Sequence, residues 1–225
     1  NKYFKFKGLN LTIETLEGLL KHNGPVEDIG LVNKLIGLKV FKGKIKYNSY
    51  PSLEAQISAI SDDIAYNNHD IQDGIKANLF KMEELVEIDF FKNIHKKYKN
   101  KITSKNYKIA IYQIIRDSID LMVRDLLNNT QKNIKMLKVK SSKDVTKSNK
   151  LIVCFSDQIK DAEKEIKFFL RNKMYDNKSV LQKNQKGKMI INKLFKIIRS
   201  NPRKFLSKDQ LTKDKYRAIS DFISG

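Results

Sequence analysis

The segment from Pro51 to Gly74 reads PSLEAQISAISDDIAYNNHDIQDG, and it decides how the rest of the sequence is interpreted. Drawn as one α-helix at about 100° per residue, it has two sides of very different chemistry. Proline suits the first turn of a helix, and Gly74 loosens the far end without necessarily ending the helix. One side carries Ile57, Ile60, Ile64, Ile71 and Ile75, and the other carries Asp62, Tyr66, Asp70 and Asp73 within an arc of roughly 80°.

Three of the polar residues form a line along this helix. Asp62, Tyr66 and Asp70 are spaced at i, i+4 and i+8, so they stack one above the other. Carboxylates around an aromatic ring suit a divalent cation, a sugar hydroxyl, or both. The ordinary interpretation, a solvated outer face of an amphipathic helix, stays open. The isoleucine side nevertheless indicates a tightly packed helix, and a tightly packed helix holds ligand-binding side chains in place better than a loose one.

The same segment resembles the last conserved block of the bacterial deoxyguanosinetriphosphate triphosphohydrolase-like proteins, a branch of the HD-domain metal phosphohydrolases. The resemblance rests on LEAQ at residues 53–56 and on DDIAYNNHDIQDG at residues 62–74. GLNLTIETLEGLLKHNGP at residues 8–25 and VCFSDQIKDAEKEIKFFLRNKMY at residues 153–175 agree with it in order and spacing. The resemblance therefore extends over most of the chain.

The resemblance implies a role for each residue of the line. Asp62 matches the final Asp of the family's metal site, and a carboxylate is a hard ligand suited to Mg²⁺ or Mn²⁺. Tyr66 matches the tyrosine that packs against the deoxyribose, and Asp70 matches the acid that reads the sugar 3′-hydroxyl. Asp63 points about 100° away from Asp62 and receives no ligand role.

Three histidines and one lysine are further candidates for functional or structural roles. His69 and Asp70 spell the dipeptide HD, but the resemblance places the family's metal-binding pair upstream, in another helix. His69 is expected to be either structural or a polar residue beside the substrate. His22 is expected to cap a helix end or to line the pocket, and His95 to lie at the solvated surface. Lys21 is a candidate for neutralising the triphosphate.

The sequence predicts an all-α protein with the HD-domain phosphohydrolase-like fold. The family's first His and its His-Asp pair are absent from the chain, so its N-terminal HD helices are expected to be missing. The chain is interpreted as a fragment, or as a shortened product, that is inactive alone. Residues 1–137 are expected to form the C-terminal part of the phosphohydrolase domain, 138–150 an exposed linker or loop, and 151–225 the phosphohydrolase-associated helical region.

Apolar spacing and cap signals place the individual helices. They are predicted at residues 12–21, 51–79, 82–98, 106–128, 157–174, 189–200 and 216–223, with Thr12 and Ser156 as N-caps. Residues 38–47 predict a loop or a small hairpin around Gly43. Cys154 is the single cysteine, which excludes an internal disulfide, and its apolar neighbours indicate burial.

The net charge of +20 raises the question of anionic partners. Only six of the 45 basic residues are Arg, and a chain rich in Lys, Asn and Ile is typical of an A+T-rich genome. Scattered lysines are ordinarily solvated. The clusters at residues 92–101 and 183–188 would still attract polyanions, which leaves nucleotide triphosphates, regulatory nucleotides and nucleic acid open as partners.

Other functional classes are excluded by missing patterns. The sequence has no P-loop, no Rossmann glycine pattern and no zinc-type Cys/His spacing. It has no apolar run of membrane-spanning length, so no membrane partner and a cytoplasmic location are expected. We expect the complete protein to be a homo-oligomer that hydrolyses a dNTP, in the manner of a dGTPase, to deoxynucleoside and inorganic triphosphate. The alternative is a degenerate or non-enzymatic basic helical protein that binds nucleic acid.

Overall fold

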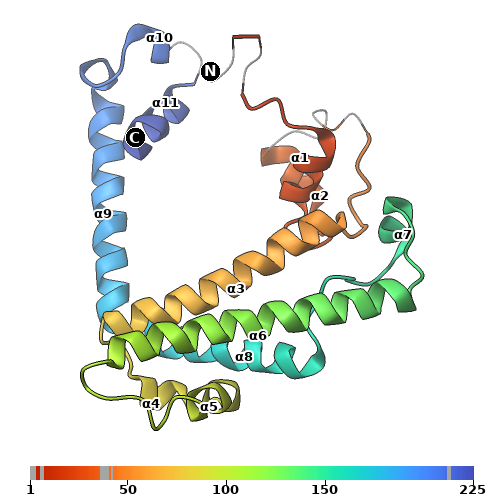
Figure 1. Cartoon of the computed structure of the whole chain (residues 1–225). Helices are drawn as coiled ribbons and strands as arrows, with labels where there is room; N and C mark the ends of the chain where they lie inside the picture. The colour runs from red at the N-terminus through yellow and green to blue at the C-terminus, as the bar shows by residue number, and fades with distance from the viewer. Residues whose placement is uncertain (1–3, 6–7, 36–40, 42, 212–213) are drawn as a thin grey trace. The chain divides into compact units, whose positions relative to one another are not determined.

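A computed structural model describes residues 4–5, 8–35, 41, 43–211 and 214–225 (Figure 1). Every regular element in these ranges is a helix, and none of these residues lies in a strand. The all-α fold predicted from the sequence is therefore confirmed. The chain divides into two compact units, Asn1–Leu170 and Arg171–Gly225, and each is described by itself.

The first unit is built around three helices that pack together. Helix α3 packs along α6, contacts α8 and receives α1 near its beginning (Figure 1). The short helices α4 and α5 follow α3, and α5 also packs on α6. The helices of this unit are α1 (Ile13–Leu20), α2 (Ile29–Leu35), α3 (Leu53–Lys76), α4 (Met82–Leu85), α5 (Asp89–Lys96), α6 (Tyr107–Met136), α7 (Ser142–Lys147) and α8 (Asp157–Leu170).

Helix α3 forms as its sequence predicts, with one exception on its apolar side. Ser52 caps it by accepting a hydrogen bond from the N–H of Ala55 at 3.4 Å. Its buried residues include Ile64, Ile71 and Ile75, but the predicted core residue Ile57 is 46% exposed. The neighbouring Gln56 is buried in its place.

Gly74 lies inside α3 and does not break it. Its backbone is helical, and the helix continues to Lys76. A Cβ atom added at Gly74 would overlap the ring of Phe80, which is buried and packs edge-on against Phe169 of α8 at a centroid distance of 4.9 Å. The glycine is therefore needed for the close approach of an aromatic ring rather than for loosening the helix end.

Two asparagines of α6 hold an extended segment that precedes α8. The amide of Asn129 donates to the carbonyl of Cys154 at 2.9 Å, and the amide of Asn133 donates to the carbonyl of Ile152 at 2.9 Å. Ile152 is fully buried, so these carbonyls would have no water to bond if the amides were removed. The thiol of Cys154 is partly buried and lies beside the same two amides.

Asp125 completes this arrangement one helical turn earlier on α6. It accepts a hydrogen bond from the backbone N–H of Ser156 at 2.8 Å and another from the Ser156 hydroxyl at 2.6 Å. Ser156 is the predicted N-cap of α8, but its hydroxyl donates to Asp125 of α6 instead. Its carbonyl still accepts the N–H of Lys160 at the start of α8.

Several predicted boundaries are wrong. Residues 82–98 form the two helices α4 and α5 rather than one, and α6 continues to Met136. Residues 138–150 are not a plain loop, because they contain α7, whose Val145 is 3% exposed. The predicted hairpin at residues 38–47 falls partly on residues 36–40 and 42, which lie outside the described residues.

The second unit consists of a long helix and a small group of short ones. A buried cluster of Ile198, Leu206 and Ile219 joins α9 to α11. Helix α9 begins eleven residues before the predicted start at residue 189. The elements are η2 (Arg171–Tyr175), α9 (Lys178–Ser200), η3 (Pro202–Lys204), α10 (Lys208–Leu211) and α11 (Lys215–Ser224). In the described part of the chain, even the longest helices are too polar to cross a lipid bilayer.

Candidate functional site

The predicted line of polar residues lies on the open side of α3. The Asp62 side chain is 59% exposed, Tyr66 is 68% exposed, and Asp70 is half-buried one turn further along. Asp73 is exposed and pairs with Lys76 at 3.5 Å. The Asp62 carboxylate and the Tyr66 ring are therefore exposed to solvent on this side of the helix.

His22 lies beside Asp62. The loop that follows α1 places its Nε2 atom 3.5 Å from Oδ2 of Asp62; the Asp62 side chain is largely exposed and that of His22 is half-buried. This contact arises because α1 packs on α3, which brings the KHNGP sequence against the polar helix. Residues 40 positions apart in the chain thus meet at one place, and His22 can donate to or accept from whatever Asp62 binds.

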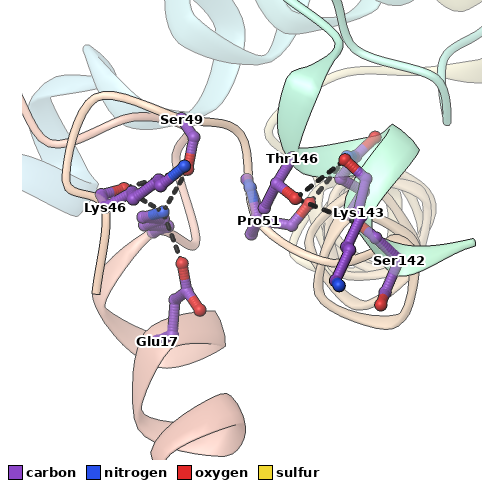
Figure 2. Close-up of polar contacts among 9 residues, drawn as sticks. Glu17, Lys46, Ser49, Pro51, Ser142, Lys143 and Thr146 are labelled. Atoms are coloured by element: carbon purple, nitrogen blue, oxygen red, sulfur yellow. Dashed lines mark hydrogen bonds and ion pairs between the residues drawn. The ribbon is translucent and has the colours of Figure 1, made fainter. Parts of the chain in front are cut away.

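Lys21 is placed differently from its neighbour. Its side chain is completely buried, and its ammonium group contacts Glu17 at 2.5 Å, the carbonyl of Lys46 at 2.6 Å and the Ser49 hydroxyl at 3.0 Å. Figure 2 shows these bonds ending on Glu17, Lys46 and Ser49. All three ammonium donors are used, so Lys21 fastens the loop at 46–49 to α1 and has no donor left for a phosphate.

A cavity of about 560 Å³ adjoins the His22–Asp62 contact. It lies between the loop after α1, the first half of α3, residues 151–153 and α8. Its polar lining includes His22, Tyr50, Gln56, Asp63 and Glu163. His22 therefore lines this cavity, whereas Asp62, Tyr66 and Asp70 lie outside its lining.

The α8 side of this cavity is held by an ion-pair network. Lys167 contacts Asp63 at 3.2 Å and Glu163 at 2.8 Å. Burial lowers the pKa of Lys167, but the hydrogen bonds and negative charges of Glu163 and Asp63 outweigh it, so the pKa is raised overall. Asp63 thus has a structural partner on α8.

Gln56 connects the beginning of α3 to the segment before α8. Its side-chain amide donates to the carbonyl of Pro51 at 2.9 Å, and its Oε1 atom accepts from the N–H groups of Ile152 and Val153, each at 3.1 Å. It is 3% exposed, and every one of these groups is removed from water. The sequence contained one signal for this role, a glutamine within the quoted LEAQ motif, but nothing that identified its partners.

The remaining predicted residues lie apart from the contacts described above. His69 is exposed on α3, and His95 is half-buried on α5. Among the described residues, no three His, Cys, Asp or Glu side chains gather closely enough to hold a metal ion. Asp62 and His22 therefore supply at most part of a ligand set.

Known proteins resemble this chain closely. Residues 153–225 match the phosphohydrolase-associated domain. The whole chain aligns with proteins named deoxyguanosinetriphosphate triphosphohydrolase-like protein, at 64% identity for that of Pelagibacter ubique, 35% for that of Bartonella henselae and 32% for that of Rickettsia typhi. The chain is a relative of the deoxyguanosinetriphosphate triphosphohydrolase-like proteins. The relationship predicted from the sequence is confirmed.

The chain spans 61%, 58% and 59% of the lengths of these three triphosphohydrolase-like proteins. The matched phosphohydrolase-associated domain begins at Val153, within the segment that Gln56 and α6 hold, and it continues through α8 and the second unit. Its first residues are thus bonded directly to the helix that carries Asp62, Tyr66 and Asp70.

Proposed function

We propose that the full-length protein hydrolyses a dNTP to deoxynucleoside and inorganic triphosphate in the presence of Mg²⁺ or Mn²⁺. The observation that carries the proposal is the open line of Asp62, Tyr66 and Asp70 on a firmly packed helix. Its support from outside the structure is the set of relatives whose names describe a triphosphohydrolase-like protein.

Asp62 is proposed to contribute one carboxylate oxygen to the divalent cation. Carboxylate is a preferred ligand type for both Mg²⁺ and Mn²⁺. The described residues do not complete the coordination of such a cation. His22, at 3.5 Å from Asp62, is proposed to hold the carboxylate in position or to contact the phosphate that approaches it.

Tyr66 and Asp70 are proposed to select the sugar. The exposed ring of Tyr66 offers a flat surface one turn away from Asp62, and a deoxyribose packed there leaves little room for a 2′-hydroxyl. Asp70 lies a further turn along and can accept a hydrogen bond from the sugar 3′-hydroxyl. A site that bonds a substrate hydroxyl rejects analogues lacking it, because its own polar group is then left unpaired.

The test is release of inorganic triphosphate from each of the four dNTPs by the full-length protein, with Mg²⁺ or Mn²⁺ present. Asp62→Ala is expected to reduce kcat/KM by about 100-fold or more, since the proposed metal ligand is lost. Asp73→Ala is the matched control, because Asp73 is an exposed acid on the same side of the same helix. It is expected to retain activity within about threefold.

Two results would contradict the proposal. Equal activities of Asp62→Ala and Asp73→Ala would show that Asp62 has no special role. Absence of triphosphate release from the unmodified protein, even with all four dNTPs mixed as possible activators, would favour a degenerate scaffold. Tyr66→Ala tests sugar selection. It is expected to lower the ratio of kcat/KM for dGTP to kcat/KM for GTP.

A further inference from the structure

The longest uniformly basic part of the chain lies in the second unit. Residues 177–208 contain ten Lys or Arg residues and no Asp or Glu. Seven of the ten lie on α9, and all seven are exposed. None of the seven forms an ion pair with a described residue. They are Lys178, Lys183, Lys186, Lys188, Lys193, Lys196 and Arg199.

On other helices of the same chain, several lysines form ion pairs within their own helix. Lys76, Lys92 and Lys164 each pair with an aspartate three residues away, at Asp73, Asp89 and Asp161. On α9, by contrast, Lys193 and Lys196 face each other as like charges one turn apart, which destabilises a helix by about 0.2–0.5 kcal/mol per pair. A genome-wide bias towards lysine codons explains many lysines but not the absence of acids from this helix.

Four of these lysines lie on one side of α9. At about 100° per residue they fall within an arc of about 80°, and they extend over about 27 Å of helix axis. They are Lys178, Lys186, Lys193 and Lys196, and we call them the α9 basic face. The opposite side of α9 carries Phe195 and the buried Ile198, which pack towards α11. The basic face therefore points away from the core of its own unit.

We propose that the α9 basic face binds the phosphate backbone of duplex nucleic acid without regard to sequence. A row of lysine ammonium groups matches a row of phosphates, and contacts to phosphates carry no sequence information. The face has no aromatic side chain on which an unpaired base could stack, which disfavours single strands.

A lipid surface is a poorer match for this helix. An interfacial helix must press its apolar side into the membrane, but Phe195 and Ile198, near the C-terminal end of α9, already pack in the cluster with α11. Exposed apolar side chains remain along α9, so anionic vesicles are included as a separate arm of the test; they are Leu181, Met189, Ile190, Ile191, Leu194 and Ile197.

The experiment measures fluorescence anisotropy of a labelled duplex of about 20 base pairs, roughly two helical turns, as full-length protein is added. The salt concentration is varied between about 50 and about 200 mM. The test variant changes the four lysines of the basic face to Gln. The control variant removes four equal charges from exposed, unpaired lysines of the first unit, Lys105, Lys132, Lys135 and Lys143, also by change to Gln. Circular dichroism checks that both variants keep their helix content.

Each lost lysine–phosphate contact is expected to lower the slope of log affinity against log salt by about 0.9. The test variant should therefore lose about 3–4 units of slope, and its affinity at about 0.1 M salt should fall by at least about 100-fold. The control variant should change the affinity by no more than a few-fold. Asp62→Ala should bind as the unmodified protein does, because the proposal does not depend on the hydrolase site.

Any of four results would overturn the proposal. The first is an equal loss of affinity in both variants, which would show that only total charge matters. The second is no measurable duplex binding at about 50 mM salt. The third is tighter binding to a single strand of the same length than to the duplex. The fourth is binding to vesicles containing phosphatidylserine without binding to the duplex.

Discussion

Replacing Gln56 by Met should strongly lower the free energy of unfolding of the first unit. Met has nearly the same length and volume, so the change removes hydrogen bonds while leaving little cavity. Three buried backbone groups would lose their partner: the carbonyl of Pro51 and the N–H groups of Ile152 and Val153. Ile152 is 0% exposed and Val153 2%, so water cannot replace the amide without local opening.

The size of the effect follows from those three groups. A buried polar group left unpaired costs about 1–3 kcal/mol, and partial relaxation places the total at about 3–6 kcal/mol. The free energy of unfolding of an ordinary domain is about 5–15 kcal/mol. With a urea dependence of about 2 kcal/mol per molar, the midpoint of unfolding should fall by about 1.5–3 M.

The assay is urea unfolding of the 225-residue chain followed by circular dichroism, with hydrogen exchange read at residues 152 and 153. Gln131→Met is the matched control, because Gln131 is exposed on α6 and should change the midpoint by no more than about 0.3 M. Equal urea midpoints for the two variants would contradict a structural role for the Gln56 hydrogen bonds. Amides of Ile152 and Val153 that stay protected in Gln56→Met would contradict it as well.

Gly74→Ala should lower the free energy of unfolding by about 1–3 kcal/mol, because the new methyl group overlaps the ring of Phe80. Gly187→Ala should raise it by up to about 1 kcal/mol, since nothing lies within 4 Å of the added carbon on α9; in thermal melting, a more stable Gly74→Ala or a less stable Gly187→Ala would contradict the respective expectation. The pKa of the Glu54 carboxyl is lowered in the folded chain by its hydrogen bonds to its own backbone N–H and to Ser52. The ionised carboxyl therefore stabilises the folded chain fully above the pKa it has when unfolded, and this stabilisation is lost as the pH falls through its folded-state pKa. Glu54→Gln should therefore melt at a lower temperature than the unmodified chain at about pH 7, and the difference should shrink as the pH falls below the ordinary glutamate pKa of about 4.3; a difference that does not shrink in acid would argue against this origin.

Much of α3 could be predicted because the residues that determine it are close together in the sequence. The 3.6-residue period separates apolar from polar positions, and Ser52 and Pro51 mark the beginning of the helix. The exception is instructive. Ile57 was expected in the core and Gln56 was not, yet Gln56 is buried. Residues 151–153 cover that part of the helix, and no periodicity within α3 can reveal a neighbour almost 100 residues away.

The same limit applies to α6. Asp125, Asn129 and Asn133 lie at i, i+4 and i+8, which in sequence looks like a solvated polar stripe. In the structure they bind the backbone of residues 152–156. Lys21 shows the reverse case, because a lysine that looked available for a phosphate is buried with all its donors used.

The all-α class, the two-sided character of α3, the family relationship and the basic character of α9 can all be inferred from the amino-acid sequence. These follow from short-range spacing, from recognisable motifs and from composition, all of which are properties of neighbouring residues. Three contacts are visible only in the folded chain: His22 meets Asp62, Gln56 joins α3 to the segment before α8, and Gly74 makes room for Phe80. Those contacts join residues from different parts of the chain or depend on how its helices pack, and packing is chosen by the whole fold rather than by any one helix.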